Sequence, residues 1–225
     1  MILENASNHN LFSGGAPASI IADFDGVLAY QNTQLLLDAC YKIISQYRPL
    51  DYSIFRQLFS SLVPHPLDLS IDFLLSSMDL NHIKAELVSA LMSTNGGISE
   101  SKTFIHHCIE KRIPLYILST GNIQAEKYRE IIELLGKDHV IAEPGLSKTN
   151  PEHYSRVTST INLTPSKTLY IDDCPTALNA AKIAGYVTAM MCNSVFRRED
   201  LPSKQEFIKI IFNNWSDALL FLENR

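Results

Sequence analysis

The fold of this chain is decided by the stretch Ser19-Ile20-Ile21-Ala22-Asp23-Phe24-Asp25-Gly26. Its first four residues, with Ala18 before them, form a short apolar run that has the length and residue types of a buried strand. Side chains alternate along a strand, so Asp23 and Asp25 would share one side if the strand continued, and Gly26 lets the chain turn sharply there. Open α/β sheets bind ligands beyond the carboxyl ends of their strands, so this edge is where chemistry is expected.

The composition is typical of a globular protein that forms one large domain, or one domain with a smaller insert. The chain has 225 residues, of which 46% are hydrophobic and 19% are charged, and its formal net charge is −5. A chain of this length can bury a sizeable core. Because it has no basic surplus, a nucleic acid polymer and an anionic membrane surface are both disfavoured as partners.

The compartment expected from the sequence is the cytoplasm. Residues 1–15 are polar and lack the basic and apolar regions of a signal peptide, and no apolar run reaches the length of a membrane span. The cysteines at positions 40, 108, 174 and 192 form no C-x-x-C pair. They are therefore expected to be reduced thiols rather than metal ligands.

Hydrophobic periodicity separates a purely helical segment, residues 31–96, from a later segment in which helices and strands alternate. Strands that alternate with helices form parallel βαβ units, so we expect an α/β protein with a doubly wound, mostly parallel, Rossmann-like sheet. The domains expected are a core of residues 1–30 and 97–225 and a small helical domain of residues 31–96. Helices are predicted over Gln31–Tyr47, Asp51–Leu62, Ser70–Met78, Asp79–Met92, Ser99–Lys111, Ile123–Leu135, Pro151–Thr160, Pro175–Ala184 and from about Trp215, and strands over Leu115–Leu118, Val140–Ala142, Thr168–Ile171, Val187–Met191 and Phe207–Ile211.

Polar residues follow two later strands of the expected sheet. Ser119-Thr120-Gly121 comes after one of them, and Asp172-Asp173 comes after another. Parallel strands end at the same edge, so both groups should lie near Asp23. Lys148 precedes a helix start expected at Asn150-Pro151, where Asn150 can cap the helix and proline suits the first position, and this also places the lysine near that edge.

Four carboxylates and one lysine would therefore meet at one edge. The carboxylates of Asp23, Asp25, Asp172 and Asp173 would raise one another's pKa unless a cation neutralised them, and Mg²⁺ is the hard, oxygen-ligated dication that fits. Together Mg²⁺ and Lys148 would balance three ionised carboxylates, which leaves one aspartate able to stay protonated.

In order and spacing, these groups resemble the motifs of the haloacid dehalogenase-like (HAD) phosphohydrolase superfamily. The motifs are residues 23–28, the strand ending in Ser119, Lys148 with its trailing Pro151-Glu152, and the strand ending in Asp172-Asp173. The similarity runs from about residue 19 to residue 222. Relatives often carry an Asp-Ser or Asp-Thr pair soon after the first motif, where this chain has Tyr30-Gln31.

The resemblance implies a role for each motif residue. Asp23 would be the nucleophile that forms an aspartyl-phosphate, and Asp25 would protonate the leaving group, activate water and offer its backbone carbonyl to the metal. Ser119 and Lys148 would complete the catalytic set by stabilising the transferred phosphoryl group. The implied metal ligands are Asp23, Asp25, Asp172 and Asp173, and the implied phosphate-binding residues are Phe24, Ser119, Thr120, Gly121 and Lys148.

The function implied is that of a Mg²⁺-dependent phosphatase of a small phosphorylated metabolite, active as a monomer or homodimer. Dehalogenases of the superfamily lack a carboxylate at the position of Asp25, so its presence favours phosphate esters. Residues 31–96 would form a helical cap, as in phosphoglycolate phosphatases. Two alternatives stay open: a β-phosphoglucomutase-like phosphomutase, and a non-catalytic binding protein on the same fold. The cap offers Lys42, Arg48, Arg56, His65 and Lys84 as substrate contacts.

Overall fold

The structure is a computed structural model that describes residues 11–12, 15–62, 67–93, 97–120, 126–142, 147–193, 195–201 and 206–224. Within these ranges, no helix is both long and apolar enough to cross a membrane.

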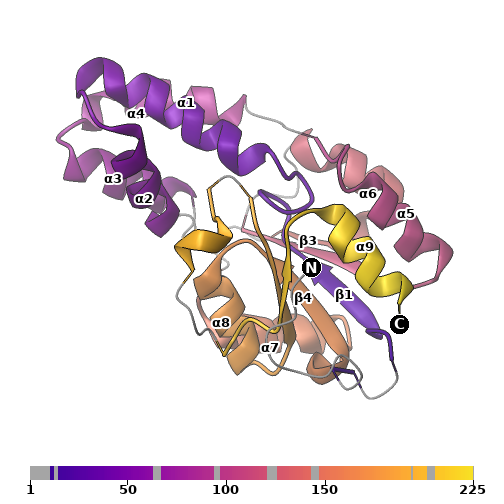
Figure 1. Ribbon diagram of the computed structural model, residues 1–225. Helices are drawn as coiled ribbons and strands as arrows, with labels where there is room; N and C mark the ends of the chain where they lie inside the picture. Colours follow the sequence, from indigo (N-terminus) through magenta and orange to yellow (C-terminus); the bar gives the residue numbers. More distant parts are fainter. Residues whose placement is uncertain are drawn as a thin grey trace.

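A six-stranded sheet forms the centre of the protein, in the order β3-β2-β1-β4-β5-β6 (Figure 1). Every neighbouring pair is parallel, and β1 lies between β2 and β4. This confirms the predicted doubly wound, parallel, Rossmann-like α/β class. The strands are β1 (Ser19–Ala22), β2 (Leu115–Ser119), β3 (Val140–Ala142), β4 (Thr168–Asp172), β5 (Val187–Met191) and β6 (Ile210–Phe212).

Helices cover both faces of the sheet, because buried side chains point alternately to each face. Ile20 and Ala22 pack in one apolar core with α5, α6 and α9, whereas Ile21 packs in the other core with α7 and α8. A strand covered on both faces has no polar side, which is why the sequence of β1 is mostly apolar. These helices are α5 (Lys102–Glu110), α6 (Arg129–Leu135), α7 (Pro151–Thr160), α8 (Pro175–Ile183) and α9 (Trp215–Glu223).

The segment between β1 and α5 forms a group of helices that we call the helical block. α1 packs against α2 and α4, and α3 packs against α4, around buried apolar side chains such as Leu37, Phe55 and Leu87. Figure 1 shows the block to one side of the sheet, entered from the loop that follows β1. The block consists of α1 (Asn32–Tyr47), α2 (Tyr52–Leu62), α3 (Leu67–Ser77), the 3-10 helix η1 (Asn81–Ile83) and α4 (Lys84–Met92).

The structure corrects several predicted element bounds. The helix predicted from Asp79 begins instead with η1, because Asp79 takes a left-handed backbone conformation with φ of 59° that a right-handed helix excludes. The helix predicted from Ser99 begins at Lys102, and β6 begins at Ile210 rather than Phe207, whose carbonyl instead accepts a hydrogen bond from the Thr188 hydroxyl.

Another correction concerns the helix predicted over Ile123–Leu135. Residues 123–125 lie outside the described ranges, and the described part consists of a 3-10 helix, η2 (Glu126–Tyr128), followed by α6. The predicted stop at Gly136 is confirmed, since this glycine has a φ of 90° that ends a helix.

Candidate active site

The loop that follows β1 carries the first motif and is shaped by a glycine. Asp23 comes directly after the strand, and its N–H still donates to the Ile171 carbonyl of β4 at 2.9 Å. Gly26 then turns the chain with a φ of 79°, and a Cβ atom at this position would run into the Thr33 hydroxyl and the Asp173 carboxylate. The glycine is therefore required for the turn and for the space that the neighbouring carboxylate occupies.

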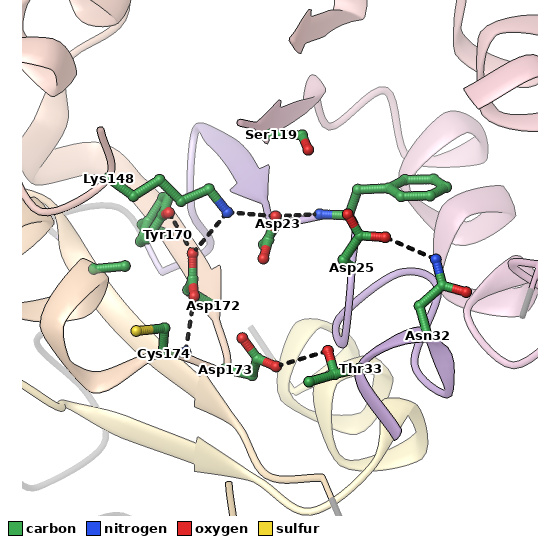
Figure 2. A network of polar contacts seen from close by, with 12 residues as sticks. Asp23, Asp25, Asn32, Thr33, Ser119, Lys148, Tyr170, Asp172, Asp173 and Cys174 are labelled. Atoms are coloured by element: carbon green, nitrogen blue, oxygen red, sulfur yellow. Dashed lines mark hydrogen bonds and ion pairs between the residues drawn. The ribbon is translucent and has the colours of Figure 1, made fainter. Parts of the chain in front are cut away.

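The second feature is an ion-paired lysine between two aspartates, which Figure 2 shows with Asp23 on one side and Asp172 on the other. The Lys148 ammonium pairs with Asp23 Oδ1 and lies 3.2 Å from Asp172 Oδ2. The lysine is only 6% exposed. Burial opposes its charge, but Asp172 and Asp23 outweigh burial and raise the pKa of Lys148. The ammonium is therefore a fixed positive charge at this edge of the sheet.

Local structure brings Lys148 to this edge. The side chain of Asn150 accepts a hydrogen bond from the Glu152 N–H at 3.0 Å and so caps α7, with Pro151 in the first turn, as predicted. The Ser147 N–H donates to His153 Nδ1 at 2.8 Å, and the Tyr154 hydroxyl donates to the Lys148 carbonyl at 3.0 Å. The lysine backbone is thus anchored to the first turn of the helix that follows it.

Asp172, the last residue of β4, is fixed at both carboxylate oxygens. Its Oδ2 accepts a hydrogen bond of 2.5 Å from the Tyr170 hydroxyl as well as the contact from Lys148. Its Oδ1 accepts a hydrogen bond of 2.8 Å from the Cys174 N–H. These partners leave the carboxylate a single orientation, toward the ammonium.

Asp173 differs because one of its oxygens has no hydrogen-bond partner among the described residues. Oδ2 accepts hydrogen bonds from Asn193 Nδ2 at 2.7 Å and from the Thr33 hydroxyl at 3.4 Å. Within the described part of the chain, Asp173 Oδ1 is buried and makes no hydrogen bond. An unpartnered buried carboxylate oxygen is costly unless a cation or solvent meets it.

The carboxylates of Asp23, Asp172 and Asp173 form a compact oxygen cluster that suits a hard metal ion. One oxygen from each lies within 4.8 Å of the others, and all three residues are buried. Burial, helped by the charges of Asp172 and Asp25 and opposed by Lys148, raises the pKa of Asp23 to about 7. Burial and the charges of Asp172 and Asp23 raise the pKa of Asp173 well above its usual value. An all-oxygen, electron-rich cluster of this kind fits Mg²⁺.

Asp25 lies two residues further on but has a different environment. Its Oδ2 is 2.5 Å from the ammonium of Lys127, and its Oδ1 accepts a hydrogen bond of 2.7 Å from Asn32 Nδ2. The side chain is about one quarter exposed and is not part of the three-carboxylate cluster. Its backbone carbonyl stays a predicted metal ligand.

The second motif lies at the end of β2. The hydroxyl of Ser119 is buried and lies 2.6 Å from the Tyr128 hydroxyl, and Thr120 follows it in a half-buried position. The predicted phosphate contact Gly121 lies outside the described residues. The Phe24 N–H donates to Asp23 Oδ1 at 2.6 Å, so that amide is engaged with the carboxylate. The phosphate-binding roles of these residues stay predictions.

No family model matches the sequence. An enolase-phosphatase E1 from Persephonella marina is 31% identical over 104 residues, which is 44% of this chain and 44% of that relative. The chain therefore aligns with less than half of that relative's length.

The solved structures that resemble this one cover almost the whole chain. A CbbY variant from Rhodobacter sphaeroides in complex with xylulose-1,5-bisphosphate has a TM-score of 0.64 at 18% identity, covering 92% of this chain and 99% of that one. A HAD family hydrolase from Deinococcus radiodurans with bound phosphate and sodium has a TM-score of 0.65 at 15% identity, covering 93% and 98%. The putative HAD-hydrolase YfnB from Bacillus subtilis, bound to magnesium, has a TM-score of 0.64 at 16% identity, covering 92% and 99%. The chain has the HAD hydrolase fold.

Several residues that shape the site of this HAD fold were missed by sequence reasoning. Asn193 follows β5, the neighbour of β4, so the strand-end argument extended by one strand would have pointed to it. Lys127 lies in a short 3-10 helix and had no such signal. The remaining missed residues are Asn32, Thr33, Tyr128 and Tyr170.

Lys127 also corrects the predicted charge balance of this candidate site. Four carboxylates face two ammonium groups, those of Lys127 and Lys148, so two negative charges remain. A divalent cation would neutralise them. The protonated aspartate expected when Lys148 was the sole lysine counted therefore no longer follows from this charge count.

Proposed function

We propose that this protein is a Mg²⁺-dependent phosphatase that hydrolyses a small phosphorylated metabolite through an aspartyl-phosphate on Asp23. The observation that carries the proposal is the position of the Asp23 carboxylate. It lies at the carboxyl edge of the central strand, paired with Lys148 and within 4.8 Å of oxygens of Asp172 and Asp173.

The first step proposed is transfer of the phosphoryl group to Asp23. A carboxylate oxygen of Asp23 forms a bond to phosphorus while the bond between phosphorus and the ester oxygen breaks. Asp25, which enters this step protonated, gives its proton to the departing oxygen. Lys148, held by two carboxylates, stabilises the negative charge of the transferred group, with the hydroxyl of Ser119 as a further donor.

The second step proposed is hydrolysis of the aspartyl-phosphate. Asp25, now ionised, takes a proton from water, and the water oxygen bonds to phosphorus as the bond to Asp23 breaks. Inorganic phosphate leaves and both carboxylates return to their starting state. The pairing of Asp25 with Lys127 and Asn32 keeps its side chain apart from the metal cluster, as a proton carrier requires.

The residues that would hold Mg²⁺ are Asp23 and Asp173, with Asp172 directly or through water and the backbone carbonyl of Asp25. When bound, the ion supplies positive charge against the phosphate oxygens. The unpartnered, buried Asp173 Oδ1 supports this assignment, since it is otherwise an unsatisfied group.

We further propose that the helical block, residues 31–96, is a cap over the site. α1 begins within a few residues of the first motif, and its Asn32 and Thr33 contact Asp25 and Asp173. Arg56 of α2 donates a hydrogen bond of 2.8 Å to the Val195 carbonyl of the loop that follows β5. A cap in this position would exclude water and admit only small substrates.

The cationic residues predicted as substrate contacts in the cap differ in the groups that they contact. Arg48 donates to the Met78 carbonyl within the block, and Lys84 pairs with Asp72 at its exposed surface. His65 lies outside the described residues. Of the predicted cations, Arg56 is the one that the structure joins to the loop after β5, so it is the cap residue we favour as a substrate contact.

Phosphate release from an aryl phosphate tests this proposal. The purified protein should release phosphate with Mg²⁺, lose activity with a chelator and recover it when Mg²⁺ is restored. Asp23→Asn should lower the rate by about a thousandfold or more. Asp72→Asn, the same change in an exposed ion pair, is the matched control and should leave the rate unchanged. Absence of phosphate release, or an active Asp23→Asn variant, would contradict the proposal, and bisphosphate-primed isomerisation without release would instead identify a phosphomutase.

A further inference from the structure

Lys127 is a partly enclosed lysine next to the proposed proton carrier. It lies in η2, and its ammonium is 2.5 Å from Asp25 Oδ2, with both side chains 26% exposed. Two neighbouring aromatic rings lie near the ammonium, with ring centres at 5.8 Å for Phe24 and 5.1 Å for Tyr128. Aromatic faces favour a cation at such distances. The rings thus help to hold the lysine beside Asp25.

The carboxylate of Asp25 is fixed at both oxygens by residues from different parts of the chain. Lys127 holds Oδ2 from the segment after β2, and Asn32 holds Oδ1 from the first turn of α1. The donor at Oδ2 is a cationic ammonium at 2.5 Å. The contact is therefore a charge-assisted hydrogen bond, which is stronger than a neutral one.

The same short helix also touches the second motif. Tyr128, the next residue, lies 2.6 Å from the hydroxyl of Ser119 and packs its ring 4.7 Å from that of Phe24. η2 therefore contacts both residues that flank the scissile ester in the proposed mechanism, Asp25 and Ser119. The mechanism so far uses Lys127 only to keep the Asp25 side chain apart from the metal cluster, and among the contacts described Lys127 touches neither Asp23 nor that cluster.

We infer that Lys127 is a positioning residue that orients the Asp25 carboxylate for proton transfer to the leaving group, and that it thereby determines how well esters with poor leaving groups are cleaved. The inference rests on the proposed phosphatase activity. An aryl phosphate expels a stable phenolate that needs no proton, whereas an alkyl phosphate expels an alkoxide that does. Loss of Lys127 should therefore harm alkyl esters selectively.

The experiment compares kcat/KM for an aryl phosphate and for alkyl phosphates such as glycerol phosphate and hexose phosphates. This ratio reports the steps up to departure of the leaving group, so the later hydrolysis of the aspartyl-phosphate does not obscure it. Lys127→Met should lower kcat/KM by about 30-fold for the alkyl ester and by less than about threefold for the aryl ester. Lys127→Arg, which keeps the charge and can still pair, should recover most of the alkyl activity.

Two controls separate positioning from a general structural effect. Lys102→Met removes a lysine from an exposed ion pair with Glu130 at 2.6 Å and should alter neither ester. In an Asp25→Asn background, Lys127→Met should add nothing to the loss of alkyl activity, because the residue acts through the carboxylate that is already gone. Lys127→Gln provides the same comparison if Lys127→Met does not fold.

Each outcome decides the inference. A selective loss for alkyl esters that vanishes in the Asp25→Asn background supports it. An equal loss for both esters, an additive loss in the double variant, or a wild type that cleaves aryl but no alkyl esters overturns it while the phosphatase stands. A wild type that cleaves neither ester overturns the proposed function and this inference with it.

Discussion

Asp23 and Asp25 are the same residue type, two positions apart in one loop, yet the structure gives them different environments. Asp23 is 8% exposed and lies among two other carboxylates and Lys148. Asp25 is about one quarter exposed and lies between Lys127 and Asn32. When surroundings separate two like groups in this way, they can take different chemical roles. Each carboxylate is therefore paired with a different lysine, Asp23 with Lys148 and Asp25 with Lys127.

The largest effect expected is a loss of Mg²⁺ affinity when the carboxylate cluster around Asp23 is altered. Asp173→Asn should weaken Mg²⁺ binding by more than about 100-fold, because loss of outer partners alone costs about 10- to 100-fold in metal affinity. Calorimetric titration with Mg²⁺ measures this, with Asp72→Asn as the exposed control. If the Asp173→Asn variant bound Mg²⁺ as strongly as the wild type, the metal would not bind at this cluster.

The turn that follows the two carboxylates offers a second test. Gly26→Ala places a Cβ against the Thr33 hydroxyl and the Asp173 carboxylate, whereas Gly136→Ala, also at positive φ, meets no atom within 4 Å. Both variants bear the strain of an alanine at positive φ, about 1 kcal/mol or more. Gly26→Ala should cost at least about 2 kcal/mol beyond that, from overpacking. Chemical denaturation measures both, and equal costs would show that the turn does not need this space.

A third effect expected is a pH dependence of stability without metal. The pKa of Asp23 is raised in the folded protein from 3.8 to about 7, so the folded state holds a proton that the unfolded state loses. This contribution is complete below about pH 4 and is lost as pH rises through about 7. Mg²⁺ should therefore raise the melting temperature more at pH 8 than at pH 5.

Thermal unfolding of the wild type and of Asp23→Asn, with and without Mg²⁺, checks this prediction. The variant cannot ionise at this position, so its metal-free stability should fall less between pH 5 and pH 8. If both proteins lost stability equally, another group would carry the pH dependence.

Much of the site could be predicted from where strands end. Asp23 and the pair Asp172-Asp173 follow parallel neighbours, β1 and β4, so the fold forces them together. Lys148 joined them because Asn150-Pro151 marks a helix start, and the structure confirms that cap. These predictions rest on backbone geometry, which short sequence patterns specify well.

The environment of Asp25 could not be predicted in the same way. Side chains two residues apart lie on the same side of a strand, but this holds only within the strand, and β1 ends at Ala22. Gly26 turns the loop, and Asp25 meets Lys127, which is 102 positions away in a short 3-10 helix. No periodic pattern locates one lysine in such an element, so its contact depends on tertiary packing alone.

The most direct test of the account is to locate the phosphoryl group on the protein. In Asp25→Asn, an aryl phosphate should still phosphorylate Asp23, since its leaving group needs no proton, but hydrolysis should be slow because the base is missing. Rapid acid quench followed by peptide mass spectrometry should find the phosphoryl group on Asp23 and none when Asp23→Asn is added. Phosphate release without any phosphorylated protein, or a phosphoryl group on another residue, would contradict the account.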